Sequence, residues 1–226
     1  MVALICILGA TGVQAVSLDE LIATGGTITN GDKIFGDFIF TSSDFAASNI
    51  EINPITDAFG VGIQIQAGFN AMEGETHDAL LQYSVTAAGP YISDLHLAFN
   101  GAIRGLAVAE VVETVFDSQM NFLTNFFVSV DPGGSIYQST VYFVPALQSL
   151  IMRKDIQLIT RDTEDFDLAT ISFVDQTFSQ IPEPNTAMLL IGGIAGLCLI
   201  RWRIRHAPQT RPGRKVPTPN ELIWHF

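Results

Sequence analysis

Cysteine is nearly absent from this chain of 226 residues. Its two cysteines, Cys6 and Cys198, both lie in strongly hydrophobic segments near the ends, so residues 16–181 contain none. This stretch therefore has no disulfide, no thiolate nucleophile and no metal site built on cysteine. A cysteine-free domain has to be stabilised by its hydrophobic core, and residues 16–181 are enough for one domain with a real core.

Positive charge is also scarce. Residues 16–181 carry five basic side chains against 21 acidic ones, a net charge of −16, and the other six basic residues of the chain follow residue 200. Such an acidic surface repels phosphate backbones, so we expect no nucleic-acid partner. It suits a secreted domain that has to stay soluble or bind cations.

Motifs for catalysis are the third absence. The chain has no Gly-x-Ser-x-Gly elbow, no phosphate-binding loop and no His-Glu-x-x-His pair. Residues 16–181 hold two histidines: His77 in the polar stretch 73–78, which could be a plain loop or a metal-binding one, and His96, interpreted as solvated on the outer face of a strand. A glycosidase needs two carboxylates roughly 5–10 Å apart, and no pair can be selected among 21. We therefore expect a non-enzymatic protein.

Alternation of apolar and polar residues dominates the middle of the chain. In residues 61–69 every odd position is apolar and every even position is Gly or Gln, a pattern that predicts a strand with one buried face. Turn residues such as Asn100-Gly101 separate the alternating segments. We predict an all-β fold, an antiparallel β-sandwich of jelly-roll type. Residues 18–24 are predicted as a short helix or loop, and residues 144–152 are ambiguous. Further strands are predicted at residues 34–41, 50–53, 81–87, 95–100, 106–116, 121–130, 135–144, 155–160 and 169–174.

Two groups of side chains are candidate binding residues. The first is a run of carboxylates, which are the hard oxygen ligands that Ca²⁺ prefers, although the glycine of an EF-hand loop is absent. A solvated acidic loop and a Ca²⁺ site both stay open, and no other cofactor is indicated. The second group is four tyrosines, which could stack on sugar rings or pack in a half-buried strand surface. The carboxylates are Asp162, Glu164, Asp165 and Asp167, and the tyrosines are Tyr83, Tyr91, Tyr137 and Tyr142.

The N-terminus has the pattern of an export signal. Residues 2–12 are an apolar run, and Val13 and Ala15 place small residues at positions −3 and −1 of a cleavage site. This predicts a signal peptide over residues 1–15, cleaved after Ala15, which would use the Sec translocon and signal peptidase. A buried first strand is the alternative.

The C-terminal region combines three features in a fixed order. Pro182-Glu183-Pro184 forms a rigid extended strip, because each proline fixes its own φ and restricts its predecessor. Residues 185–202 follow as an apolar stretch of roughly 27 Å in helical form, just enough for a bilayer core of about 30 Å. Arg201, Arg203 and Arg205 would hold its end on the cytoplasmic side. We therefore predict a single C-terminal transmembrane helix after the sandwich, and a plain single-pass anchor stays open.

Pro182-Glu183-Pro184, the apolar helix and the arginine cluster together resemble the PEP-CTERM sorting domain of Gram-negative envelope proteins. The resemblance implies that an exosortase recognises the three residues and removes or exchanges the helix. It also implies an inner-membrane intermediate, a mature protein in the envelope or outside the cell, and a bacterium that makes exopolysaccharide. Residues 17–35 and 93–97 resemble blocks seen in many such proteins.

The resulting organisation has four parts. A signal peptide at residues 1–15 precedes an extracytoplasmic domain at 16–181, a sorting signal at 182–206 and a basic, proline-rich disordered tail at 207–226. The expected function is that of an exported structural or adhesive protein linked to exopolysaccharide and biofilm. The alternatives are a carbohydrate-binding module, with extracellular polysaccharide as partner, and a secreted glycan hydrolase.

Overall fold

The computed structural model describes residues 15–89, 91–162 and 166–180. The sorting motif Pro182-Glu183-Pro184, Arg201, Arg203, Arg205, the tail 207–226 and most of the predicted signal peptide lie outside these residues. Ala15 is the first described residue and is exposed. Within the described part of the chain, no helix is long and apolar enough to cross a membrane, and the predicted span at 185–202 lies outside it.

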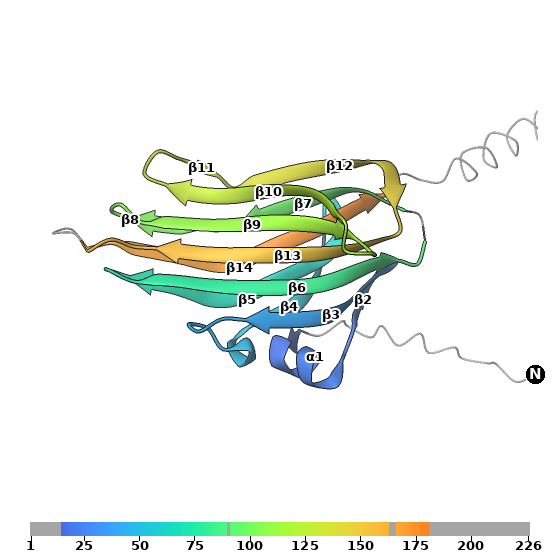
Figure 1. Ribbon diagram of the computed structural model, residues 1–226, viewed down its shortest axis with the longest axis horizontal. Helices are drawn as coiled ribbons and strands as arrows, with labels where there is room; N and C mark the ends of the chain where they lie inside the picture. The colour runs from blue at the N-terminus through green and yellow to red at the C-terminus, as the bar shows by residue number, and fades with distance from the viewer. Residues whose placement is uncertain (1–14, 90, 163–165, 181–226) are drawn as a thin grey trace, which may run out of the picture. The chain divides into compact units, whose positions relative to one another are not determined.

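The described residues form two antiparallel sheets that pack face to face (Figure 1). This confirms the prediction of an all-β sandwich. The first sheet has the order β1 (Val16–Ser17), β4 (Glu51–Asp57), β5 (Gly60–Met72), β14 (Leu168–Gln180), β7 (Ile92–Phe99) and β12 (Gln138–Leu147), with β8 (Ala102–Arg104) pairing β14. The second has the order β11 (Gly134–Ile136), β10 (Phe122–Asp131), β9 (Val108–Asp117), β13 (Ser149–Ile159), β6 (Thr76–Ala87), β3 (Lys33–Thr41) and β2 (Ile28–Asn30).

Alternation along each strand produces the core between the sheets. In β6 the side chains of alternate residues from Ala79 to Ala87 are buried, and in β9 those from Ala109 to Val115. Their neighbours point to the outer faces, because successive strand residues point to opposite sides. The ambiguous residues 144–152 are the end of β12, a one-residue turn and the start of β13.

One α-helix lies beside β3 at the β2–β3 edge of the second sheet (Figure 1). This helix, α1 (Leu18–Thr24), carries Asp19 and Glu20 in its first turn, where negative charge favours the positive end of the helix dipole. Gly25 ends it in the left-handed region at φ 60°, and its N–H and that of Gly26 bond the last carbonyls. Residues 18–24 are predicted as a short helix or a loop, and the structure has the helix. A 3₁₀ turn, η1 (Ala47–Asn49), precedes β4.

Candidate functional site

The centre of the first sheet presents a polar outer face that we call the His96 face. It is built from outward-facing residues of five neighbouring strands of this sheet, which lie side by side. His96 on β7 pairs Thr177 on β14 and Thr140 on β12, while Asp94 pairs Ser179 and Tyr142. Gln64 on β5, Asp175 on β14 and Asp57 at the end of β4 complete the face.

Phe59 covers His96. It lies in the turn between β4 and β5, where its N–H donates a 2.7 Å hydrogen bond to Asp57 Oδ1. The two rings stack with centroids 3.7 Å apart and planes inclined by 13°. His96 is 4% exposed, whereas Phe59 keeps 46% of its surface exposed. Because the imidazole covers one side of the phenyl ring, the exposed part is the other side and the ring edge, which form an apolar platform.

Burial under Phe59 lowers the pKa of the His96 imidazole below its ordinary value of 6.5. The carboxylates of Asp57, Asp94 and Asp175 act in the opposite direction, and burial is the larger effect. The imidazole is therefore neutral at pH 7, and its Nδ1 lies 2.9 Å from Thr140 Oγ1. The prediction of a solvated surface histidine was right about the face of the strand and wrong about solvation, because a turn residue distant in sequence covers the ring.

Hydrogen-bonding groups surround this platform. Gln64 Nε2 donates a 2.9 Å bond to Asp175 Oδ1, and Ser179 Oγ donates to Asp94 Oδ2. Burial raises the pKa of the Asp175 carboxyl, and the bond from Gln64 opposes this. Tyr142, 74% exposed, adds a second aromatic ring beside Asp94. The face can therefore stack on a flat ligand and accept hydrogen bonds from its hydroxyl groups.

A polar groove continues the same sheet surface. It has a volume of about 390 Å³ and is floored by β5 at Gln66 and Gly68, which share the outward parity of Gln64. Along a strand, Gly62 and Gly68 are separated by about 20 Å. The groove thus extends the site toward the η1 turn. Its lining residues are Ser48, Asn49, Glu51, Gln66, Ala67, Gly68 and Ser172.

The four predicted tyrosines are divided by the fold. Tyr142 lies on the His96 face, whereas Tyr91 and Tyr137 are half-exposed away from its centre, the Tyr137 ring packing on Phe99 at 6.0 Å. Tyr83 is fully buried, so the prediction that it could stack on a sugar was wrong. It occupies an inward position of β6, and its ring packs on those of Phe35 and Phe38. Phe59 was missed, although a large apolar residue in a turn is itself a signal.

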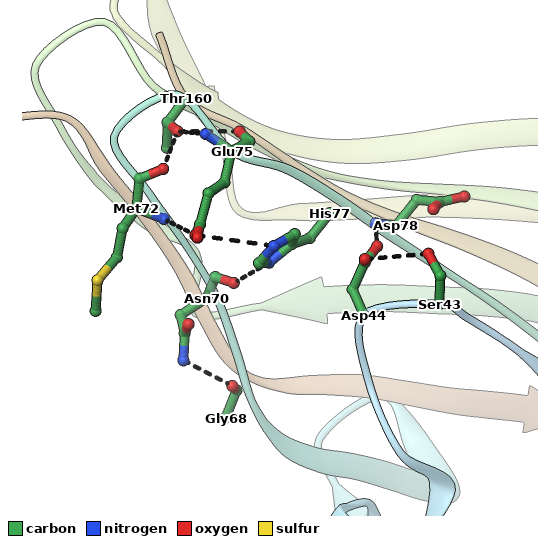
Figure 2. Close-up of polar contacts among 9 residues, drawn as sticks. All are labelled: Ser43, Asp44, Gly68, Asn70, Met72, Glu75, His77, Asp78 and Thr160. Atoms are coloured by element: carbon green, nitrogen blue, oxygen red, sulfur yellow. Dashed lines mark hydrogen bonds and ion pairs between the residues drawn. The ribbon is translucent and has the colours of Figure 1, made fainter. Parts of the chain in front are cut away.

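The polar stretch 73–78 forms the turn between β5 and β6 and the start of β6 (Figure 2). His77 Nδ1 lies 2.7 Å from the Asn70 carbonyl oxygen, while Glu75 Oε2 accepts a 2.7 Å bond from the Met72 N–H. Thr160 Oγ1 donates to the Met72 carbonyl and accepts from the Glu75 N–H. These groups bind one another and the backbone, so they tie the hairpin end to the residue after β13.

The predicted Ca²⁺ ligands have different surroundings. Asp167 is fully buried, and its carboxylate accepts hydrogen bonds from the N–H groups of Leu106 at 3.0 Å and Arg161 at 3.2 Å. Asp162 is exposed, and Glu164 and Asp165 lie outside the described residues. Nowhere in 15–89, 91–162 and 166–180 do three His, Cys, Asp or Glu side chains gather closely enough to hold a metal ion. The Ca²⁺ site stays a prediction.

Comparison with known proteins shows no match to a family model and no match among curated proteins. Among solved structures, the chain is similar to the enzymatically active domain of bacteriophage CBA120 tailspike protein 4, with 10% identity over 63% of this chain and 19% of that one and a TM-score of 0.31. It is similar to TmCBM61 in complex with beta-1,4-galactotriose, with 8% identity, 63% and 89% coverage and a TM-score of 0.30. It is also similar to a carbohydrate-binding module of the beta-sandwich superfamily, with 9% identity, 64% and 57% coverage and a TM-score of 0.28. Likenesses this distant carry no inference about the function of this chain.

Proposed function

We propose that this chain is an exported β-sandwich protein that binds polysaccharide through the His96 face and does not cleave or modify it. The observation that carries the proposal is the Phe59–His96 stack beside Tyr142. A sugar ring has one side rich in C–H groups and a rim of hydroxyls. The C–H side can stack on an exposed aromatic ring. The hydroxyl groups can form hydrogen bonds with Asp94, Asp175 and their amide and hydroxyl neighbours.

The dimensions and charge of the site support a more specific ligand. The face and the polar groove together extend about 20 Å along β5, which suits several linked sugars better than a single one. The net charge of −16 over residues 16–181 would repel a polyanion. We therefore propose a neutral or weakly charged polysaccharide as the ligand.

Phe59→Ala is the variant that tests this proposal. We expect it to weaken retention on the polysaccharide of the native organism by about 2 kcal/mol, or about 30-fold in Kd, as for the loss of a central aromatic contact. Binding of the purified full chain would be measured by affinity electrophoresis in gels containing that polysaccharide.

Phe127→Ala provides the matched control. Phe127 is 44% exposed on the second sheet and lines an apolar groove of about 400 Å³ there. Its replacement is expected to leave retention unchanged. If Phe127→Ala lost retention while Phe59→Ala kept it, binding would lie on the second sheet. If the unmodified chain were not retained at all, glycan binding would be contradicted altogether.

We further propose that Pro182-Glu183-Pro184 is the exosortase recognition motif and that the protein reaches the envelope or the exterior after the C-terminal segment is removed. Replacing the three residues with alanines should leave full-length protein in the inner membrane. The check is the mass of the C-terminal peptide from cells and medium. If the protein with an unchanged Pro182-Glu183-Pro184 motif also still ended at Phe226, the C-terminal segment would be a permanent anchor instead.

A further inference from the structure

Three polar side chains meet between the two sheets in what we call the Lys154 cluster. Lys154 on β13 and Glu113 on β9 are direct cross-strand partners in the second sheet, and Gln176 comes from β14 of the first. All three are fully buried. Lys154 Nζ donates to Glu113 Oε2 and, over 2.6 Å, to Gln176 Oε1.

The surroundings of the cluster are apolar. Leu81 lies opposite Lys154 on β6, and Val111 and Val115 flank Glu113 on the inward side of β9, all nearly or completely buried. In such a site burial raises the pKa of the Glu113 carboxyl and lowers that of the Lys154 ammonium. Both effects favour a neutral acid beside a neutral amine. A neutral, desolvated lysine amine is a nucleophile.

The hydrogen bonding of the cluster is incomplete. Among the described residues, Gln176 Nε2, Glu113 Oε1 and the Tyr83 hydroxyl are buried without a hydrogen-bond partner. An amide N–H₂ group buried in this way is unfavourable, since such groups are almost always paired. The hydrogen bond from Lys154 Nζ to Gln176 Oε1 brings the amine next to the side-chain amide of Gln176.

We propose that Lys154 and Gln176 form an amide bond that joins the two sheets, with Glu113 transferring the protons. Lys154 Nζ attacks Gln176 Cδ, and the Glu113 carboxyl protonates the carbonyl oxygen and takes up a proton from the attacking nitrogen. Glu113 then donates a proton to Nε2, the Cδ–Nε2 bond breaks and ammonia leaves, and Glu113 takes up the hydroxyl proton as the carbonyl is restored. Glu113 ends in its starting state, and no oxidant or cofactor is consumed.

This assignment explains the cluster better than a bond to Glu113 itself. Condensation of Lys154 with Glu113 would consume the acid that transfers protons, and it would leave the Gln176 N–H₂ group in place. The bond to Gln176 removes that unpaired group as ammonia. It also provides a covalent link between sheets in a domain without cysteine, where no disulfide could do so.

Peptide mass spectrometry tests the proposal on the unmodified protein. The full chain is produced in a host without exosortase, purified in mild detergent, denatured and digested with trypsin and a glutamate-specific protease. We expect peptide 154–161 linked to peptide 165–201, because the Glu183–Pro184 bond resists cleavage, with a mass about 17 Da below the sum of the two. Cleavage after Lys33, which is also fully buried and whose Nζ donates to Asp32 Oδ1, is the internal control.

The outcomes separate clearly. Cleavage after Lys154 with unmodified 165–201 overturns the bond. A linkage to the peptide that contains Glu113, with a loss of about 18 Da and no cleavage after Glu113, overturns the choice of Gln176. Glu113→Gln keeps the size of the side chain and should abolish the link, with circular dichroism showing that the strands remain. A linked Glu113→Gln protein would overturn the role of Glu113.

Discussion

Glu113→Leu is expected to lower the free energy of unfolding by about 3–5 kcal/mol. The change fills the volume of the side chain but removes the acid that faces Lys154, and with it the proton transfer that the proposed Lys154–Gln176 bond requires. The amine then stays in the apolar space between the sheets, fully buried, and Gln176 is the hydrogen-bond partner that remains to it among the described residues. Removing one partner of a buried pair lowers stability by more than the intact pair contributes, because the other partner stays buried without compensation. Urea unfolding of the purified chain, followed by circular dichroism, measures the difference.

The control is the double variant Glu113→Leu with Lys154→Met. Both buried polar groups are then replaced by apolar side chains of similar volume, a change that is often neutral or stabilising. We expect it to recover most of the loss relative to Glu113→Leu. Neither variant can carry the proposed cross-link, so their difference reports the unpaired lysine alone. Equal stability of the two variants would contradict the burial of Lys154.

Gly62→Ala is expected to destabilise the fold by about 3 kcal/mol, the upper end for overpacking. A Cβ at this position would lie 1.8 Å from the carbonyl oxygen of Gln176 and 2.7 Å from its carbonyl carbon. These are backbone atoms of a central strand, so relief requires β5 and β14 to separate. The same urea measurement applies.

Gly68→Ala serves as the comparison for that variant. Gly68 belongs to the same strand, and a Cβ there would meet nothing within 4 Å. Its replacement should change the free energy of unfolding by less than about 0.5 kcal/mol. If both variants lost a similar amount of unfolding free energy, the cost would come from replacing any glycine of β5. It would then not come from the close approach of Gly62 to β14.

The strand positions could be read from the sequence because burial of one face enforces alternation. The same rule could have located the Lys154 cluster. Inward positions of β13 read Leu150, Met152, Lys154, Ile156 and Leu158, so the lysine stands among buried apolar neighbours. Lysine side chains are normally exposed, and this general tendency hid the fact that Lys154 stands at an inward position of the alternating pattern. Gln176 was harder to find, because a bulge between Ile171 and Phe173 changes the pairing of β14.

The binding face was less accessible from sequence. His96 could be assigned to an outer face from its strand, but its cover by Phe59 depends on how the β4–β5 turn folds over β7. Tyr83 and Tyr142 both occupy strands, and only the direction of each strand in the sandwich distinguishes a core ring from an exposed one.

The sequence by itself determined the all-β class, and it determined the absence of a disulfide and the acidic charge of residues 16–181. These follow from composition and from patterns between residues a few positions apart. Only the tertiary structure decided which strands pair and which face carries the Phe59–His96 stack. It also decided that Glu113, Lys154 and Gln176 meet between the sheets. Those contacts join segments far apart in the chain, whose approach depends on the packing of the whole sandwich rather than on local preference.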